Sequence, residues 1–143
     1  MNLSPMPELF AARRPEVAAR LADAGRAASV VVDADLLALA RARVATLVGH
    51  PAGDAALAGW PTDPALSQRD RDCLAFVEQY VFDVANVDDD LVANASRHFS
   101  DGGFRDFVVA LYLTELTLRL ELAERALLGP ATPSAARTDR RPM

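Results

Sequence analysis

Apolar residues recur along much of this chain at the three- to four-residue spacing of helices that bury one face. The longest such stretch, Phe104–Leu128, contains neither glycine nor proline and consists mostly of Leu, Ala, Glu and Arg, which favour helix. Between Phe107 and Ala123 most positions are apolar, which is typical of a helix buried on most sides. We therefore expect a long carboxyl-terminal helix against which the rest of the chain, or further copies of it, must pack.

Two helices are predicted in the amino-terminal third. The first covers Pro15–Ala24, because proline suits the first helical position and Gly25 suits a stop. The second is capped by Asp33 or Asp35, whose side chain can accept a backbone N–H at the helix start. It runs to Val48, after which Gly and Pro residues indicate its end.

Two more helices are predicted before the long one. Ser67–Ala85 begins with Ser-Gln-Arg-Asp, which has the spacing of a capping box with Asp in place of the commoner Glu. After a turn, Asp88 or Asp89 caps a short helix to Phe99, since the helix dipole favours acidic side chains at its start. Residues 50–66 hold several Gly and Pro and are predicted to be a loop with one helical turn.

Together these segments predict one all-α domain. A chain of 143 residues suits a single domain and buries roughly 70% of its unfolded surface, so it needs no disulfide or metal to hold it together. We expect a compact bundle of five or six helices over residues 15–128, preceded by an arm over 1–14. Residues 129–143 have low hydrophobicity and three prolines, which predicts a disordered tail.

Charge and composition narrow the classes of function. The net charge is −5, and all 15 basic residues are arginine, so the chain lacks the basic surface of nucleic-acid-binding proteins and the lysine of Schiff-base enzymes. No apolar run reaches the roughly 20 residues that span a bilayer, and the first residues do not resemble a signal peptide. We expect a cytoplasmic protein with no nucleic-acid or membrane partner.

Three segments carry a resemblance to a known family. They read LLALARARVATLVG at 36–49, LSQRDRDCLAFVEQYVFDV at 66–84 and RHFSDGGFRDFVVALYLTELTLRLELA at 97–123. In this order they resemble the carboxymuconolactone decarboxylase / alkylhydroperoxidase-D-like family, over about two-thirds of the chain. The resemblance implies an all-α fold and a homo-oligomer, and it matches Arg119 to an arginine near the middle of the family's last helix.

The chain departs from this family where redox-active members carry C-x-x-C followed by histidine. Residues 49–54 read Gly-His-Pro-Ala-Gly-Asp and contain no cysteine. The single cysteine, Cys73, lies on the following helix and is interpreted as a small core residue. A thiol peroxidase of this type needs one thiolate to attack and a second thiol to close the disulfide. The sequence therefore predicts a chain without peroxidase activity.

The strongest candidate for other chemistry is a polar stripe on the long helix. Tyr112, Glu115 and Arg119 have i, i+3 and i+7 spacing, which places them on one helical face. In a pocket wall, Arg119 could bind a substrate carboxylate, Glu115 could move a proton and Tyr112 could donate a hydrogen bond. The same residues could instead form a structural ion pair that fixes helix register or bridges subunits.

Three further residues are candidates, each with a structural alternative. Glu78 could be a general acid or base with a pKa raised by apolar surroundings, or a partly exposed residue at the edge of its helix face. His50 could be a proton shuttle where the reactive motif is missing, or an ordinary loop residue. Trp60 could close a substrate pocket as a lid or anchor its loop to the core. His50 and His98 are far apart in sequence and have no acidic ligand at helical spacing, so no metal site is predicted.

Two hypotheses for function follow. The first is a cofactor-free lyase or isomerase that acts on a small organic acid or carbonyl compound by proton transfer. Its catalytic residues would be Glu115, Tyr112, Glu78 and His50, and its substrate-binding residues Arg119 and Trp60. The second is a catalytically silent relative that serves as an oligomeric binding or scaffold subunit.

Overall fold

The computed structural model describes residues 8–128, which are all-helical, with no β-strand in that range. This confirms the predicted fold class. The bounds of the α-helices are α1 (Glu8–Arg13), α2 (Pro15–Val31), α3 (Ala34–Val48), α4 (Gln68–Asp83), α5 (Asp89–Ser96) and α6 (Gly103–Leu128). Two 3-10 helices, η1 (Ala55–Thr62) and η2 (Val84–Asn86), flank α4. The predicted tail at 129–143 lies outside the described residues, as does the first half of the predicted arm.

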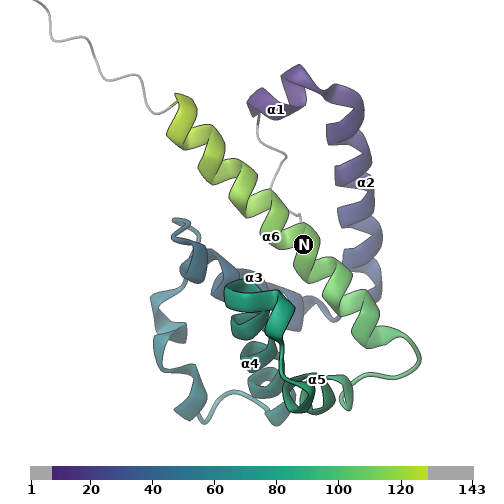
Figure 1. Ribbon diagram of the computed structural model, residues 1–143, viewed down its shortest axis with the longest axis vertical. Helices are drawn as coiled ribbons and strands as arrows, with labels where there is room; N and C mark the ends of the chain where they lie inside the picture. Colours follow the sequence, from purple (N-terminus) through teal and green to yellow (C-terminus); the bar gives the residue numbers. More distant parts are fainter. Residues whose placement is uncertain (1–7, 129–143) are drawn as a thin grey trace, which may run out of the picture.

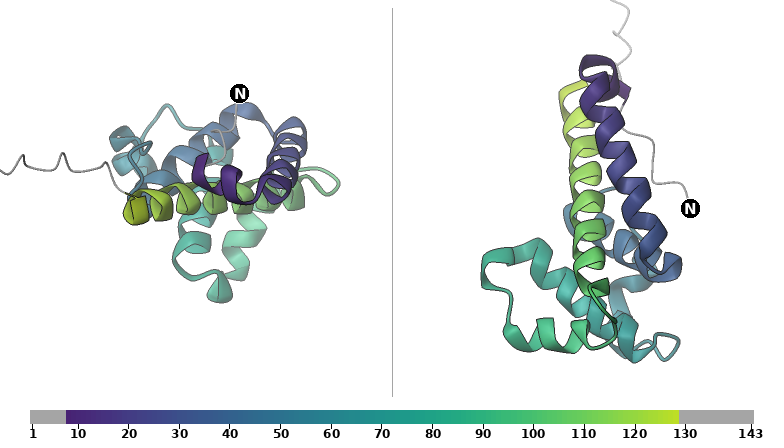
Figure 2. Two further views of the ribbon diagram at one scale, coloured as in Figure 1. Left: turned by 90° about the horizontal axis from the view of Figure 1, so that it is seen from above. Right: turned by 90° about the vertical axis from the view of Figure 1, so that its right-hand side faces the viewer.

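Helix α6 crosses the whole molecule, and the other helices are arranged around it (Figure 1). Helix α2 packs on α6 and runs in roughly the opposite direction, as the right view of Figure 2 shows, and α3 packs on another side. Helix α4 packs on α3, and α5 packs on α4. Helix α6 therefore separates α2 from the α4–α5 part of the chain, so side chains on its different faces meet different neighbours.

The core lies where α3, α4 and α6 meet. Phe107, Leu111 and Leu118 are fully buried on α6 and follow the i, i+4, i+11 spacing of one helical face. Val44 on α3 and Val77 on α4 are also fully buried and belong to the same cluster. Each such side chain contributes about 1.5–3 kcal/mol when it leaves water, so this stripe fixes the position of α6.

The predicted starts of α3, α4 and α5 and the end of α3 are confirmed by local contacts, whereas α4 and α5 end at Asp83 and Ser96, before the predicted Ala85 and Phe99. The Asp33 and Asp88 side chains accept backbone N–H groups at the starts of α3 and α5. Ser67 and Asp70 form both hydrogen bonds of a capping box at the start of α4. Gly49 ends α3 with a φ of 77°, a left-handed conformation that is costly for other residues.

The predicted stop of the first helix at Gly25 is wrong, because α2 continues through this residue to Val31. Gly25 is buried, as are Ala18 and Ala28 on the same face. Helix α2 packs chiefly against α6, and small side chains on this face let the two backbones approach closely. This packing outweighs the roughly 1 kcal/mol that glycine costs inside a helix.

The amino-terminal segment contains more regular structure than was predicted. Helix α1 forms within the predicted arm and packs on α2. The backbone N–H of Leu9 donates a hydrogen bond of 2.9 Å to Oε1 of Glu124 near the far end of α6. This contact fixes the start of the described chain beside the last turns of α6.

The expectation that α6 is buried on most sides is not met within one chain. Its buried residues form a single stripe, while Val109 and Tyr112 are 47% and 54% exposed. Phe82, at the end of α4, is also exposed. Helix α6 thus carries more apolar surface than its own chain covers.

Candidate functional site

The six candidate residues lie in three separate groups. His50 pairs with Glu121, Glu78 binds Arg43 and Trp60, and Tyr112, Glu115 and Arg119 share a face of α6. We describe each group in turn, because its partners decide what its side chains can do.

The first group joins the loop after α3 to α6. His50 is buried, and its Nε2 lies 2.5 Å from Oε2 of Glu121, whose side chain is 17% exposed. On the other side of the ring, Nδ1 accepts a hydrogen bond of 3.0 Å from the backbone N–H of Ala52. Since Nδ1 accepts, the ring proton lies on Nε2 and points at the carboxylate.

This arrangement occupies both ring nitrogens of His50. A proton shuttle needs one nitrogen that a substrate or water can reach, and here each nitrogen already has a protein partner. The contact between His50 and Glu121 therefore has a structural role and joins the loop after α3 to α6. Glu121 was missed by the sequence analysis, although Thr114, Leu118 and Glu121 continue the buried face of α6 at i, i+4 and i+7. A carboxylate on the buried face of a helix needs a partner, and this position of Glu121 was the sequence signal for one.

The second group is centred on Oε1 of Glu78. This atom accepts hydrogen bonds of 2.8 Å from Nε of Arg43 and 2.7 Å from Nε1 of Trp60, and the other Arg43 contact is 2.6 Å. The Arg43 side chain is only 14% exposed. Oε1 of Glu78 thus already has two protein donors, the Arg43 guanidinium and the Trp60 indole, and is not surrounded by apolar groups alone.

Trp60 anchors η1 to the core. It is buried and clusters with Leu57 and Leu74 while its indole N–H reaches Glu78. Of the two interpretations of Trp60, lid and anchor, this geometry matches the anchor. Arg43 was not among the residues predicted, because a single arginine on a helix gives no sequence signal of its distant partner.

The third group lies on the outer side of α6. Nε of Arg119 donates a hydrogen bond of 2.9 Å to Oε1 of Glu115, and the Glu115 side chain is 16% exposed. Tyr112 and the Arg119 side chain are both more than half exposed. The predicted i, i+4 pair of Glu115 and Arg119 is therefore present, but two of the three residues of the stripe, Tyr112 and Arg119, are exposed.

Tyr80 on α4 belongs to this third group and was missed. Burial raises the pKa of the Tyr80 phenol, and the nearby Glu115 carboxylate and Tyr112 phenol raise it further. Its ring lies 6.0 Å from that of Phe76, measured between centroids. The third group thus places the Glu115 carboxylate near the phenols of Tyr80 and Tyr112, a combination that acid–base sites also use.

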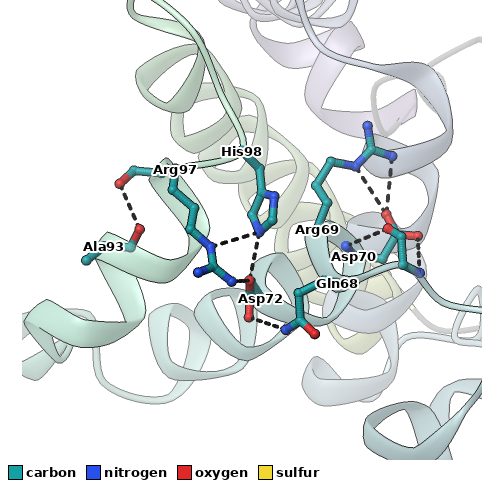
Figure 3. Close-up of polar contacts among 9 residues, drawn as sticks. Gln68, Arg69, Asp70, Asp72, Ala93, Arg97 and His98 are labelled. Carbon is teal, nitrogen blue, oxygen red and sulfur yellow. Dashed lines mark hydrogen bonds and ion pairs between the residues drawn. The ribbon is translucent and has the colours of Figure 1, made fainter.

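A fourth polar cluster, outside the candidate residues, ties α4 to the end of α5 (Figure 3). Oδ2 of Asp72 lies 2.7 Å from Nε2 of His98 and 3.0 Å from Arg97, and Oδ1 accepts from Gln68 at 2.9 Å. Nε of Arg97 also lies 3.4 Å from Nε2 of His98, but this nitrogen cannot accept from Arg97 while it donates to Asp72. Because the contact to the Asp72 carboxylate is shorter, the ring proton of His98 lies on Nε2 and points at Asp72. Burial alone would raise the pKa of Asp72, but the hydrogen bonds from His98, Gln68 and Arg97 outweigh it and lower this pKa.

Cys73 is a core residue without thiol reactivity. It is 1% exposed, and burial raises the pKa of its thiol to about 12, so almost no thiolate exists at neutral pH. Among residues 8–128, no three His, Cys, Asp or Glu side chains are close enough together to share a metal ion.

A shallow groove of about 340 Å³ lies between α2 and α6. Its walls are mainly the small and apolar side chains Ala24, Ala27, Ala28, Val31, Val109 and Leu113, with Asp106 as the charged member. None of the six candidate residues lines it. Within the described range, no helix combines the length and the apolar character that crossing a membrane requires.

Comparison with family models, with curated proteins and with solved structures finds no match for this chain. The resemblance to the carboxymuconolactone decarboxylase / alkylhydroperoxidase-D-like family therefore stays a prediction from the sequence.

Proposed function

We propose that this chain is a catalytically silent, homo-oligomeric binding or scaffold subunit with the architecture of the carboxymuconolactone decarboxylase-like family. The observation that carries the proposal is the separation of the six candidate residues into three groups, in which every member except the exposed Tyr112 binds a partner within the chain. Catalysis by proton transfer needs an acid or base and a binding group within reach of one substrate. His50, Glu78 and Glu115 each bind a different protein partner instead.

The excess apolar surface supports the oligomeric part of the proposal. Val30, Val31 and Val109 are between 47% and 82% exposed, and side chains of this kind are usually covered when they cluster. The cytoplasmic location expected from the sequence belongs to the same proposal.

The test combines a mass measurement with an activity screen. We expect light scattering to give a multiple of the chain mass for the purified protein. We also expect wild type and the variants His50→Gln, Glu78→Gln and Glu115→Gln to form no product from a panel of lactones, keto acids and unsaturated carboxylic acids. A product made by wild type but not by a folded Glu115→Gln variant would contradict the silent part, and a monomer would contradict the oligomeric part.

A proton-transfer enzyme is the second candidate, and the third group is what favours it. Glu115 is half-buried beside Tyr80 and Tyr112 and is paired with Arg119, so one place does combine acid–base groups with a cation. In this case Glu115 would move the proton and Arg119 would hold a carboxylate. Product formation that is lost in both Glu115→Gln and Arg119→Gln, with unchanged circular dichroism, would identify it.

A further inference from the structure

The groove between α2 and α6 is an apolar surface that the chain leaves uncovered. On its α2 side, Ala24 and Ala27 are exposed and Val31 is 60% exposed. On its α6 side, Val109 is 47% exposed, and Val30 extends the patch beyond the groove with 82% exposure. Contiguous apolar surface of this kind is typical of a contact with another molecule.

Two opposite charges belong to this surface. Asp106 lines the groove near the start of α6. Arg20 lies on the same face of α2 as Ala24, Ala27 and Val31, because positions 20, 24, 27 and 31 follow i, i+4, i+7 and i+11 spacing. Neither the Asp106 nor the Arg20 side chain has a hydrogen-bond or ion-pair partner among residues 8–128.

Asp106 lines one end of the groove, and Arg20 lies on α2 one turn before Ala24, beyond the other end. Helices α2 and α6 are antiparallel, so the start of α6, where Asp106 lies, is level with the end of α2 (Figure 2). Arg20 precedes Val31 by 11 residues, which is about 16 Å along a helix that rises 1.5 Å per residue. Within one chain the charges are therefore too far apart to pair.

We propose that a second copy of this chain covers the groove, in a two-fold dimer in which Asp106 of each copy pairs with Arg20 of the other. When the two-fold axis is perpendicular to the groove, the same surface meets itself with its ends exchanged, so Asp106 of one copy faces Arg20 of the other. The apolar walls then meet in the middle, and α2 and α6 of both copies form a four-helix contact.

A second copy fits better than an unrelated occupant because both unpaired charges find partners at once. A basic partner helix would satisfy Asp106 but leave Arg20 unpaired, and an acidic partner would do the reverse. The inference rests on the proposed function, since it names the partner of the oligomeric subunit.

The first experiment reverses the charges. We expect Arg20→Asp and Asp106→Arg each to weaken dimerisation by tenfold or more in sedimentation equilibrium, since each places like charges opposite each other twice. The double variant Arg20→Asp/Asp106→Arg restores opposite charges and should recover dimerisation to within about threefold of wild type. Arg125→Asp, an exposed change of equal charge at the far end of α6, is the control and should leave the dimer intact.

The second experiment tests proximity. We expect oxidised Arg20→Cys/Asp106→Cys to run as a covalent dimer on a non-reducing gel, while Arg20→Cys alone stays a monomer. An oligomer whose association none of these charge changes alters would overturn this interface and leave the proposed oligomeric function standing. A wild-type monomer would overturn both, and turnover by an intact dimer would overturn only the silent function.

Discussion

Nε2 of His50 and Oε2 of Glu121 lie 2.5 Å apart across a buried contact between the loop after α3 and the second half of α6. The two residues are 71 positions apart in sequence. This hydrogen bond fixes the loop that begins at His50 against α6. It also occupies Nε2 of the histidine that the sequence suggested for proton transfer.

Removal of the Glu121 carboxylate should destabilise the fold. Glu121→Ala leaves the buried Nε2–H of His50 without an acceptor, which should cost about 1–3 kcal/mol of unfolding free energy. Glu121→Gln keeps a neutral acceptor and should cost less. Urea denaturation at neutral pH measures both, with the exposed Arg125→Gln as control. Equal urea midpoints for wild type and Glu121→Ala would show that the contact between His50 and Glu121 does not stabilise the fold.

Glu78 should control the environment of Trp60, which is the only tryptophan. Glu78→Ala removes the acceptor of the indole N–H and leaves the Arg43 charge, 14% exposed, without its carboxylate. We expect a loss of about 1–3 kcal/mol, because the indole N–H and the partly buried guanidinium both lose their acceptor. The fluorescence emission of Trp60 should shift to the red as water reaches the indole. An unchanged emission spectrum would show that Trp60 is anchored without Glu78.

Glu115 should raise the pKa of Tyr80 measurably. The chain has two tyrosines, so Tyr112→Phe leaves Tyr80 as the only phenol to titrate. Removing the carboxylate charge in Tyr112→Phe/Glu115→Gln should lower the Tyr80 pKa relative to Tyr112→Phe. Because burial is the largest cause of the shift, we expect the pKa to stay above the usual value of about 10 in both. Tyrosinate absorbance against pH measures it, and identical titrations would place Glu115 away from Tyr80.

Asp72 should stabilise the protein at neutral pH and lose this effect in acid. Its pKa is lowered by folding, so the stabilisation is complete above the unfolded-state pKa of about 3.9 and is lost as pH falls through the lower native pKa. We expect Asp72→Asn to cost about 1–2 kcal/mol at neutral pH, because hydrogen bonds to a charged acceptor are lost. Urea denaturation over a pH series should show the difference from wild type shrinking below pH of about 4. A difference that does not change with pH would contradict an ionised Asp72.

The sequence predicted the helices well where the signals were local. Ser67 and Asp70 lie three residues apart, and their reciprocal hydrogen bonds are decided by that spacing alone. Gly49 likewise ends α3 through its own backbone conformation. Gly25 misled the prediction because its conformation is set by packing against α6, which no local pattern records.

The candidate residues were identified more reliably than their partners. The i, i+4 pair Glu115–Arg119 follows from helical spacing and is present. The partners of His50 and Glu78 come from other elements, so single-sequence spacing could not pair them. The exposure of Tyr112 does not follow from helical spacing either, since an apolar helix face does not reveal whether its own chain covers it.

The small residues on the buried face of α2 affect which part of the molecule unfolds first. Ala18, Gly25 and Ala28 have small side chains or none, and α2 packs chiefly on α1 and α6, whereas α3 packs on both α4 and α6. Segments that bury few large apolar side chains are the first to unfold locally. Amide hydrogens of α2 should therefore exchange with solvent sooner than those of α3, and dilution of the protein should speed that exchange if a second copy covers the helix.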